Sequence, residues 1–502
     1  LKGRKLSSPK KNPQTRYIND LRRHDYIQSQ VYRLKGIIVP VGLSIVFLAV
    51  VGLIVSGWHD TYGKDWIIVV IAAIFGGYMA LNIGANDVAN NMGPAVGGKV
   101  LTVLSAVLIA AVCESAGALL AGGDVVRTVS KGIISPGEQL SISEFQTIML
   151  SSLLAAALWI NLATILSAPV STTHSIVGGV LGAGIAAAGL NIVNWSTMAK
   201  IAASWFISPV IGAIIAAGFL LFIKVQILNV ENRLQAAQRW VPILIATMAA
   251  VFAAYMSLKG LKKIWKPEDI EIVLFSTACF VLAYFFSKPY IANRVKKLTN
   301  RKSDVYSLFN LPLIAGVALL SFAHGANDVA NAVGPLAAIV STIGQDTGIV
   351  QKVTIPLWVM SVGAFGIALG LGLFGPKLIA VVGAKITRLN SPRAYCVAIS
   401  AAITVLIATT AGLPVSSTHI AIGAVFGVGF LREFIENPNR RKLRPGHLVN
   451  KTADDAFKSP GVRSIRRLVR RRFLFAIAAA WVITVPASAL IAAISYKLLR
   501  LL

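Results

Sequence analysis

The residues best suited to chemistry in this chain lie in a short segment that occurs twice. Residues 84–94 read GANDVANNMGP and residues 325–335 read GANDVANAVGP, so nine of the eleven positions are identical. Each copy follows a long apolar run, where a carboxylate is costly and is by default a candidate for function. Asp87 and Asp328 are therefore the leading candidate residues.

The spacing within the motif indicates what the two aspartates could bind. Asp87 and Asn90, like Asp328 and Asn331, are three residues apart and would share one face of a helix. Carboxylate and amide oxygens suit a hard cation, and the lack of an accompanying Cys or His cluster favours sodium over a transition metal. We therefore expect these residues to bind sodium, as a transported ion and not as a cofactor.

Other polar residues near the motif have supporting or open roles. Asn86 and Asn327 are expected to cap or orient rather than bind, because Asn is a good helix N-cap. Glu114 lies among small residues and could bind another sodium, carry a proton or bond to a neighbouring helix. His324 precedes only the second copy, where the first has Ile83, and the pattern assigns it no role.

A second repeated motif follows each aspartate. Residues 169–174 read PVSTTH and begin 82 residues after Asp87, while residues 414–419 read PVSSTH and begin 86 residues after Asp328. Proline is favoured in the first turn of a helix, and Ser or Thr hydroxyls cap free backbone N–H groups. A helix starting here would direct its positive end and its hydroxyls at one point, which suits an anion.

The hydroxyls of the two Pro-Val-Ser motifs would together suit a tetrahedral oxyanion such as phosphate. The six candidate phosphate-binding residues are Ser171, Thr172, Thr173, Ser416, Ser417 and Thr418. His174 and His419 close the motifs and are expected to orient these segments. The alternative is that Ser, Thr and Pro only kink packed helices, but both copies lie beside repeated aspartates, which favours a site.

The composition defines the class of protein. The chain has 502 residues, of which 56% are hydrophobic and 14% charged, and its mean hydropathy is +0.71. Soluble domains carry roughly 25% charged residues, so this is a membrane protein with many spans and not a soluble enzyme. The net charge of +28 is concentrated in a few loops, which favours membrane orientation over nucleic-acid binding. No P-loop is present in the sequence, which argues against an ATP-driven pump.

Hydropathy predicts an all-α fold with thirteen helical spans. They cover residues 36–57, 65–85, 100–122, 145–168, 175–190, 197–223, 240–258, 270–287, 306–324, 353–375, 393–412, 419–431 and 473–498. A full span needs about 20 residues, so the spans 175–190 and 419–431 are short. Each follows a Pro-Val-Ser motif and is expected to be a half-helix or one arm of a re-entrant hairpin, which protein or water must line.

Charge orients these spans. Residues 1–35 hold ten Lys or Arg and are expected to be cytoplasmic. Thirteen crossings then place the basic loops on that side, namely 224–239, 288–305, 376–392 and 432–472. The loop 259–269, predicted outside, fits less well because it carries four lysines. The helices before Asp87 and Asp328 would run in opposite directions, so the repeats are inverted and the site lies between them near the midplane.

The repeats divide the chain into six parts. These are a basic N-terminus with one extra helix (1–64), the first repeat (65–239), linking helices with a basic loop (240–305), the second repeat core (306–431), a basic loop (432–472) and a final helix (473–502). The first span lies outside the repeats and carries no site motif. We expect residues 1–57 to be dispensable for the transport chemistry.

The paired motifs resemble those of the inorganic phosphate transporter family, the sodium- or proton-coupled phosphate symporters. The likeness extends to Glu114 in CESAG (113–117) and to ASWFISP (203–209), and it covers about residues 65–500. The N-terminal 60 residues depart from the family pattern, which begins with the helix before the first motif. The resemblance implies an integral, multi-pass protein of the plasma or inner membrane that is not an enzyme and uses no cofactor.

The expected function is import of inorganic phosphate by symport with sodium through alternating access. A divalent phosphate beside two carboxylates cannot be desolvated alone, so cations and phosphate must bind together. The expected partners are phosphate, sodium or protons, and the lipid bilayer; a homo-oligomer is compatible with the sequence. Two rivals stay open, a proton-coupled phosphate symporter and a sulfate permease of the same family, since sulfate has nearly the shape of phosphate.

Overall fold

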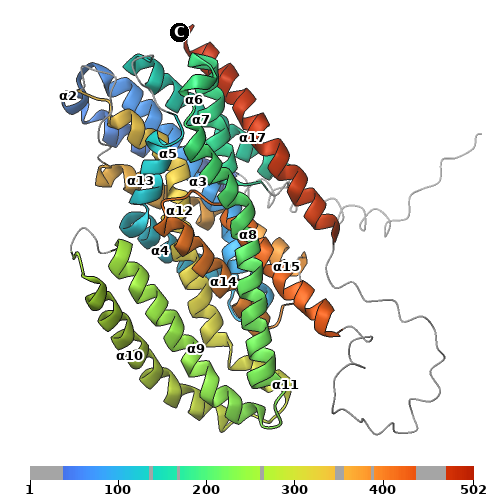
Figure 1. The fold of residues 1–502 in the computed structure, drawn as a ribbon. Coiled ribbons are helices and arrows are strands. Elements are labelled where there is room, and N and C mark those ends of the chain that lie inside the picture. The colour runs from blue at the N-terminus through green and yellow to red at the C-terminus, as the bar shows by residue number, and fades with distance from the viewer. Residues whose placement is uncertain are drawn as a thin grey trace, which may run out of the picture.

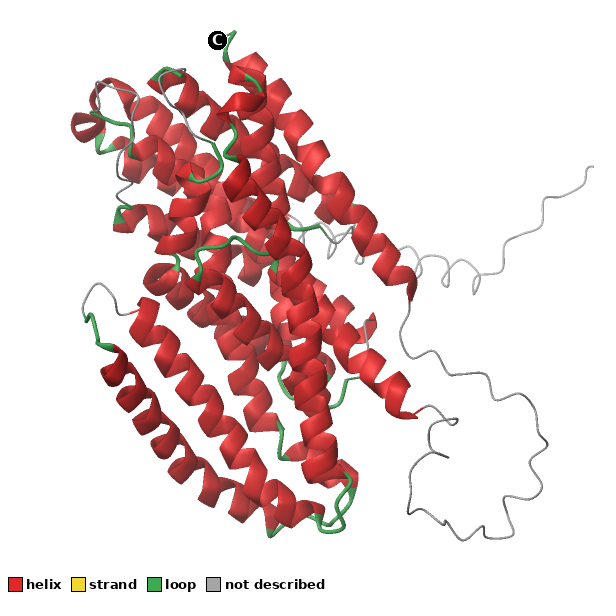
Figure 2. Ribbon diagram, viewed as in Figure 1, coloured by secondary structure: helices red, strands yellow, loops and turns green. Residues whose placement is uncertain are grey.

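Apolar segments of the predicted kind form helices in the computed structural model of the chain. The structure describes residues 38–134, 140–166, 170–260, 265–344, 355–385, 389–436 and 471–501. These residues form helices and loops without a β-strand, apart from one isolated bridge between Ile134 and Val193 (Figure 2). Within them, twelve helices are long and apolar enough to cross a membrane, and Thr172–Ala188 is a shorter apolar helix. The predicted all-α fold with twelve to thirteen spans is confirmed.

The helices follow one another along the chain with few long connections. The first spanning helix is Ile38–Ser56. The first half continues with α2 (His59–Tyr62), α3 (Trp66–Gly97), α4 (Val103–Ala121), α5 (Gly123–Lys131), α6 (Ile142–Ile165), α7 (Thr172–Ala188) and α8 (Trp195–Ile223). The second half has α9 (Arg233–Tyr255), α10 (Asp269–Val295), α11 (Lys302–Ser307), α12 (Asn310–Val340), α13 (Leu357–Lys385), α14 (Ser391–Thr410), α15 (Ser417–Glu436) and α17 (Arg471–Leu499).

The repeated aspartate motifs lie inside two continuous helices, α3 and α12. The predicted spans 65–85 and 306–324 ended where the motifs begin, and that detail was wrong. Both helices continue past the proline of the motif, which is Pro94 in α3 and Pro335 in α12. An internal proline removes one backbone hydrogen bond, and neighbouring helices can compensate for it in a membrane protein. The aspartates therefore project from regular helical turns.

The Pro-Val-Ser motifs mark the helix starts. Helix α7 begins at Thr172 and helix α15 at Ser417, each directly after a serine of the motif; Pro169 lies outside the described residues. Helix α7 has 17 residues and is short, as its sequence predicts. Helix α15 has 20 residues and is longer than the predicted span 419–431, because its polar C-terminal residues continue the helix beyond the apolar run.

The helices that carry the aspartate motifs cross their neighbours at glycines. Gly84 of α3 faces the backbone of Ile367 on α13, and Gly325 of α12 faces the backbone of Glu114 on α4. A Cβ atom at either glycine would lie 2.0 Å from a carbonyl oxygen, so only glycine permits these close approaches. Helix α3 thus packs on α13 and α12 on α4, which interlocks segments from the two halves of the chain.

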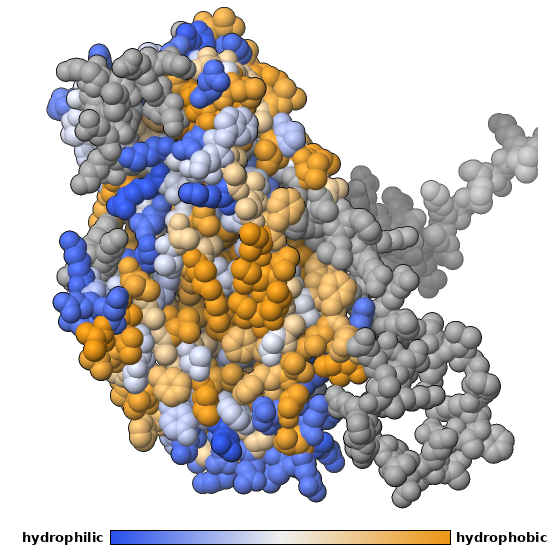
Figure 3. Space-filling view, in the orientation of Figure 1, coloured by the Kyte–Doolittle hydropathy of each residue, from blue (hydrophilic) through white to orange (hydrophobic). Residues whose placement is uncertain are grey.

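Hydrophilic loops lie at opposite ends of the helical bundle. Helix α2 and the C-terminus lie at one end, and α11 lies at the other (Figure 1). Hydrophobic side chains cover much of the visible face between them, and hydrophilic ones gather at the lower end (Figure 3). Lys259, in the basic loop predicted outside, forms an ion pair with Asp124 on α5. The basic segments 1–37 and 437–470 lie outside the described residues.

Two of the basic loops predicted to share the cytoplasmic side meet beside α11. The backbone N–H of Arg233 donates to Asn300 Oδ1 over 2.9 Å. Asn300 Nδ2 in turn donates to the carbonyl of Glu231 over 2.8 Å. The loops 224–239 and 288–305 therefore lie at the same end of the bundle.

Candidate functional site

Two aspartates from the repeated motifs approach each other in the buried centre of the bundle. Asp87 on α3 and Asp328 on α12 are each only 1% exposed. The hydroxyl of Thr172, at the start of α7, lies 3.2 Å from Asp87 Oδ2 and 3.3 Å from Asp328 Oδ2. One hydroxyl therefore connects two carboxylates that come from opposite halves of the chain.

The second Pro-Val-Ser motif contributes hydroxyls to the same pair of carboxylates. Thr418 donates to Asp87 Oδ1 over 2.9 Å, and Ser417 donates to Asp328 Oδ2 over 3.3 Å. Because Thr172 and Ser417 are the first residues of α7 and α15, both helix N-termini point at the aspartates. The positive ends of the two helix dipoles therefore stabilise negative charge at this centre.

The amides three residues after each aspartate bind hydroxyls from the opposite half of the chain. Asn90 Nδ2 donates to Thr418 Oγ1 over 2.8 Å, and Asn331 Nδ2 donates to Thr173 Oγ1 over 3.0 Å. The two contacts are equivalent when the halves are exchanged. The structure thus brings four residues expected to bind sodium together with four of the six hydroxyls expected to bind phosphate.

The other two hydroxyls of the motifs cap their own helices. Ser171 Oγ accepts the backbone N–H of His174 at 3.2 Å, and Ser416 Oγ accepts that of His419 at 3.3 Å. Ser171 Oγ also lies 2.8 Å from His174 Nδ1. An N-cap of this kind satisfies a backbone donor that would otherwise be unpaired. In this structure, the two serines fix where α7 and α15 begin.

Two buried oxygens of the second aspartate motif have no hydrogen-bond partner among the described residues. They are Asp328 Oδ1 and Asn331 Oδ1, and neither side chain is more than 1% exposed. A buried polar atom without a partner costs about 1–3 kcal/mol, and more if it is charged. Carboxylate and amide oxygens are ligands of hard cations, so these two atoms are well placed to bind one.

His324, to which the sequence pattern assigned no role, lies between the two aspartates. Its Nε2 is 3.3 Å from Asp328 Oδ2 and 3.7 Å from Asp87 Oδ2, and the side chain is fully buried. Ligand atoms of the three residues all lie within 4.8 Å of one another. The sequence argued only against a Cys or His cluster, so this single buried histidine does not contradict that prediction but is a feature it left unassigned. The spacing of four residues from His324 to Asp328, one helical turn, was the signal that could have revealed it.

The histidine does not make this centre a typical transition-metal site. Such sites draw mainly on imidazole and thiolate ligands. Here a single imidazole stands among carboxylate, amide and hydroxyl oxygens of the described residues. The donor set still favours a hard cation, which is the chemistry that the aspartate and asparagine spacing predicts.

A buried polar chain continues from His324 to α4. Glu114 Oε2 lies 3.2 Å from His324 Nδ1, and Glu114 Oε1 accepts a hydrogen bond from Asn91 Nδ2 at 2.9 Å. Glu114 is completely buried. The imidazole thus stands between Glu114 and the two aspartates. Asn91 was missed because it occupies a motif position that differs between the two copies.

The asparagines that precede the aspartates hold the Pro-Val-Ser segment of their own half. Asn327 Oδ1 accepts the backbone N–H of Val415 at 3.1 Å, and Asn327 Nδ2 donates to the carbonyl of Leu413 at 3.1 Å. Asn86 Nδ2 lies 3.4 Å from the carbonyl of Val170 and 3.1 Å from Asp87 Oδ1. These contacts tie the start of each short helix to the motif helix beside it.

Trp205 on α8 and the two motif histidines form an aromatic cluster that packs against both Pro-Val-Ser motifs. The ring of His174 stacks on Trp205 with centroids 3.7 Å apart, and the ring of His419 meets that of His174 at 4.8 Å. Trp205 Nε1 also donates to the carbonyl of Pro414 over 3.3 Å. Trp205, which lies in the segment 203–209 of the resemblance, therefore contacts both motifs.

Comparison with known proteins gives a consistent result. A sequence model of the phosphate transporter family matches residues 83–492. The "Putative phosphate permease" of Helicobacter pylori strain J99 is 48% identical over 415 residues, or 82% of this chain and 77% of that protein. The "Inorganic phosphate transporter 2-1, chloroplastic" of Arabidopsis thaliana is 35% identical over 450 residues, or 84% and 70%. A solved structure described as "The sodium-dependent phosphate transporter" aligns with a TM-score of 0.74 and 35% identity over 87% of this chain and 100% of its own.

Proposed function

This chain belongs to the phosphate transporter family, and we propose that it imports inorganic phosphate by symport with sodium. Its helices make it an integral membrane protein with many spans. The observation that carries the proposal is the convergence of two helix N-termini and two repeated aspartates on one buried centre. The sodium dependence named for the similar solved structure supports the choice of cation. We place the protein in the plasma or inner membrane.

The proposed division of roles follows the chemistry of the side chains. Sodium is bound by the carboxylates of Asp87 and Asp328 with the amide oxygens of Asn90 and Asn331. The unpartnered Oδ1 atoms of Asp328 and Asn331 support this assignment. Phosphate is bound by hydroxyls, which are Thr172, Thr173, Ser417 and Thr418, and by the N-termini of α7 and α15. Glu114 contacts the sodium site indirectly, through the imidazole of His324.

The proposed coupling uses hydroxyls that can serve either partner. Thr418 donates to Asp87, and Ser417 donates to Asp328. A sodium ion that takes over a carboxylate oxygen weakens this bond and leaves the hydroxyl available to a phosphate oxygen. Bound phosphate in turn adds negative charge beside the cation. Each ligand therefore raises the affinity for the other, and linkage requires the two effects to be equal.

Alternating access is supported by the equivalent contacts of the two halves. The glycine crossings of α3 on α13 and of α12 on α4 correspond to each other. In Figure 1, α7 and α15 extend from the centre toward opposite ends of the molecule, as an inverted repeat requires. We propose that rocking of the halves breaks the Asn90–Thr418 and Asn331–Thr173 contacts in turn. Such motion would open the centre to each side of the membrane.

The same centre favours phosphate over sulfate. Phosphate keeps a proton near neutral pH that it can donate, whereas sulfate offers only acceptors. Both aspartates lie within hydrogen-bond distance of hydroxyls assigned to the oxyanion, so a carboxylate acceptor stands beside it. An oxyanion without a proton cannot donate to this carboxylate, so we expect sulfate to bind more weakly than phosphate.

Proton coupling is the second candidate, and one observation favours it. His324 lies within 3.3 Å and 3.7 Å of the two aspartates and 3.2 Å from Glu114, which forms a buried chain of ionisable groups. Such chains serve as proton relays in other pumps and transporters. In this alternative, a proton replaces one of the sodium ions as the coupled cation.

Uptake of radiolabelled phosphate into proteoliposomes tests the proposal. We expect an inward sodium gradient to drive accumulation, replacement of sodium by choline to abolish it, and excess sulfate to compete weakly. Thr418→Val, which keeps the shape and removes the hydroxyl, should weaken uptake, while Thr247→Val on α9, remote from the centre, should not. Accumulation driven by a proton gradient in choline would overturn sodium coupling, and equal competition by sulfate would overturn the choice of phosphate.

A further inference from the structure

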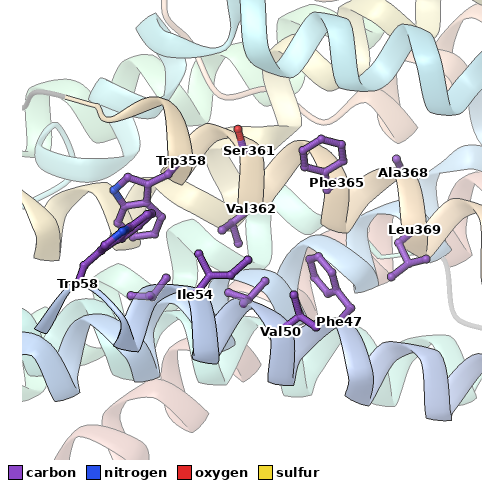
Figure 4. Close-up of a pocket in the computed structure, with 12 residues that line it drawn as sticks. Phe47, Val50, Ile54, Trp58, Trp358, Ser361, Val362, Phe365, Ala368 and Leu369 are labelled. Atoms are coloured by element: carbon purple, nitrogen blue, oxygen red, sulfur yellow. The ribbon is translucent and has the colours of Figure 1, made fainter.

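A hydrophobic groove lies on the membrane-facing side of the bundle, away from the carboxylate centre. It is formed between the first helix, Ile38–Ser56, and α13, and it encloses about 700 Å³ (Figure 4). One wall carries Phe47, Ile54 and Trp58, and the other carries Trp358, Phe365 and Leu369. Ser361 supplies the one hydroxyl among the lining residues. The groove therefore suits a hydrocarbon and not a polar ligand.

The length of the groove matches one leaflet of a bilayer. Trp58, two residues beyond the end of the first helix, lies eleven positions after Phe47, and Leu369 lies eleven positions after Trp358 on α13. At a rise of about 1.5 Å per residue, each wall is about 16 Å long. The hydrocarbon core of a bilayer is about 30 Å thick, so the groove covers about half of it. That is the depth reached by one acyl chain.

One end of the groove has the features of a membrane–water interface. Trp58 and Trp358 meet edge to face with ring centroids 5.4 Å apart, and Tyr62 lies 6.4 Å from Trp358. The side chains of His59 and Asp60, at the start of the short helix α2 that follows, are 62% and 93% exposed. Trp and Tyr concentrate at the level of lipid headgroups. The aromatic end therefore lies at the interface, and the Phe47 end lies deeper.

We propose that this groove holds one acyl chain of a membrane phospholipid, whose headgroup lies at the Trp58 end. The groove opens toward the bilayer, because Ile54 and Phe365 on its walls are 55% and 61% exposed. A second copy of the chain would have to insert a helix about 10 Å wide between the two walls. The segment 1–35 carries ten Lys or Arg and does not match an apolar lining.

The inner end of the groove adjoins the helices that carry the site. Phe47 lies 3.3 Å from the Cβ position of Gly77 on α3 and 3.5 Å from that of Gly366 on α13. Gly77 precedes Gly84, the point at which α3 crosses α13, by two helical turns. A retained acyl chain would therefore pack over the junction of three helices and support the α3–α13 crossing.

Photolabelling with a modified lipid tests this proposal. The protein is reconstituted with phosphatidylcholine that carries a diazirine in one acyl chain, extracted into lipid-free detergent and then irradiated. We expect label in the peptides that contain residues 47–58 and 358–369, several-fold above label on α10. Leu274 and Phe286 of α10 are 65% and 77% exposed, so they report contact with bulk lipid. If the amount of label on each peptide simply increases with the exposed fraction of its side chains, the proposal is overturned.

A pair of matched variants sharpens the test. Ala368→Phe places a ring in the groove, whereas Ala278→Phe places the same ring on the exposed surface of α10. We expect Ala368→Phe to reduce labelling of the groove peptides several-fold and Ala278→Phe to leave it unchanged. Undiminished labelling in Ala368→Phe would contradict the proposal. So would a crosslink of the groove to residues 1–37, or to a second copy, in the wild-type protein.

Discussion

The two helix crossings at Gly84 and Gly325 make equivalent close backbone contacts but bury different side chains. At the α3–α13 crossing, the buried side chains are Ile83 and Ile367. At the α12–α4 crossing, the corresponding side chains are His324 and Glu114, with Nδ1 and Oε2 3.2 Å apart. An apolar pair at one crossing is thus replaced by an ionisable pair at the other.

A third departure from the repeat lies in the same place. Asn91 of the first motif corresponds to Ala332 of the second, and Asn91 donates to Glu114 over 2.9 Å. Three polar residues without a repeated counterpart therefore form one chain, although they come from three different helices. Duplication accounts for the symmetric part of the centre, the carboxylates, amides and hydroxyls. The chain from Asn91 to His324 makes the surroundings of Asp87 and Asp328 unequal.

The largest expected effect comes from Asp87→Asn and Asp328→Asn, each of which removes one charge and keeps the shape. Both variants should lose concentrative phosphate uptake, because a cation ligand is lost. Asp328→Asn should impair the sodium response more, since Oδ1 of Asp328 is the oxygen without a donor in the described structure. Uptake measured against sodium at several pH values checks this. Variants that shift only the pH profile and keep the sodium response would contradict the assignment.

The next effect concerns the polar chain itself. His324→Ile alone should destabilise the protein by about 3–5 kcal/mol, because Glu114 is left buried without its ionic neighbour. Adding Glu114→Ile should restore much of that stability, since the apolar pair already packs at the α3–α13 crossing. Thermal unfolding in detergent measures both variants.

Ile83→Val at the α3–α13 crossing is the matched control and should lower the free energy of unfolding by about 0.5–1.5 kcal/mol.

The double variant, His324→Ile with Glu114→Ile, should also show a weaker sodium response in uptake than the wild type. A double variant no more stable than His324→Ile would show that an apolar pair cannot replace Glu114 and His324 at this crossing.

A smaller difference is expected between two equivalent hydroxyls. Thr418 donates to the carboxylate of Asp87, whereas Thr173 donates to the carbonyl of Val415. Hydrogen bonds to charged groups are worth about 1.5–3 kcal/mol and neutral ones about 1 kcal/mol. Thr418→Val should therefore raise the sodium concentration for half-maximal uptake several-fold more than Thr173→Val. Equal shifts would mean that the two halves act alike.

The smallest effect is expected from the N-caps. Ser171→Ala and Ser416→Ala should each destabilise by about 1 kcal/mol and raise the phosphate concentration for half-maximal uptake modestly. Ser171→Ala should have the larger effect, because its hydroxyl also contacts His174 Nδ1 at 2.8 Å. If the phosphate concentration for half-maximal uptake is unchanged in both variants, the positions of the α7 and α15 N-termini do not depend on these caps.

Repetition made much of this centre predictable from the sequence. Asp87 and Asp328 stood out because each is a lone acid at an apolar run and each occurs in the same motif. The Pro-Val-Ser motifs predicted helix starts because proline and serine act locally, through backbone angles and caps. Such local rules also predicted that α7 would be short.

The features that the sequence did not reveal depend on packing between distant segments. His324 and Asn91 have no repeated partner, so only the approach of α4 to α12 and α3 shows their role. The continuity of α3 and α12 through the motifs was missed for a similar reason. Gly and Pro read locally as breaks, but the close crossing at Gly84 uses a glycine within an unbroken helix.

The most direct test of sodium symport is phosphate binding to the purified protein as sodium replaces choline at constant ionic strength. We expect sodium to raise phosphate affinity, phosphate to raise sodium affinity by the same factor, and Asp328→Asn to abolish both effects. A phosphate affinity that is the same at every sodium concentration, but changes with pH, would contradict sodium coupling at this centre.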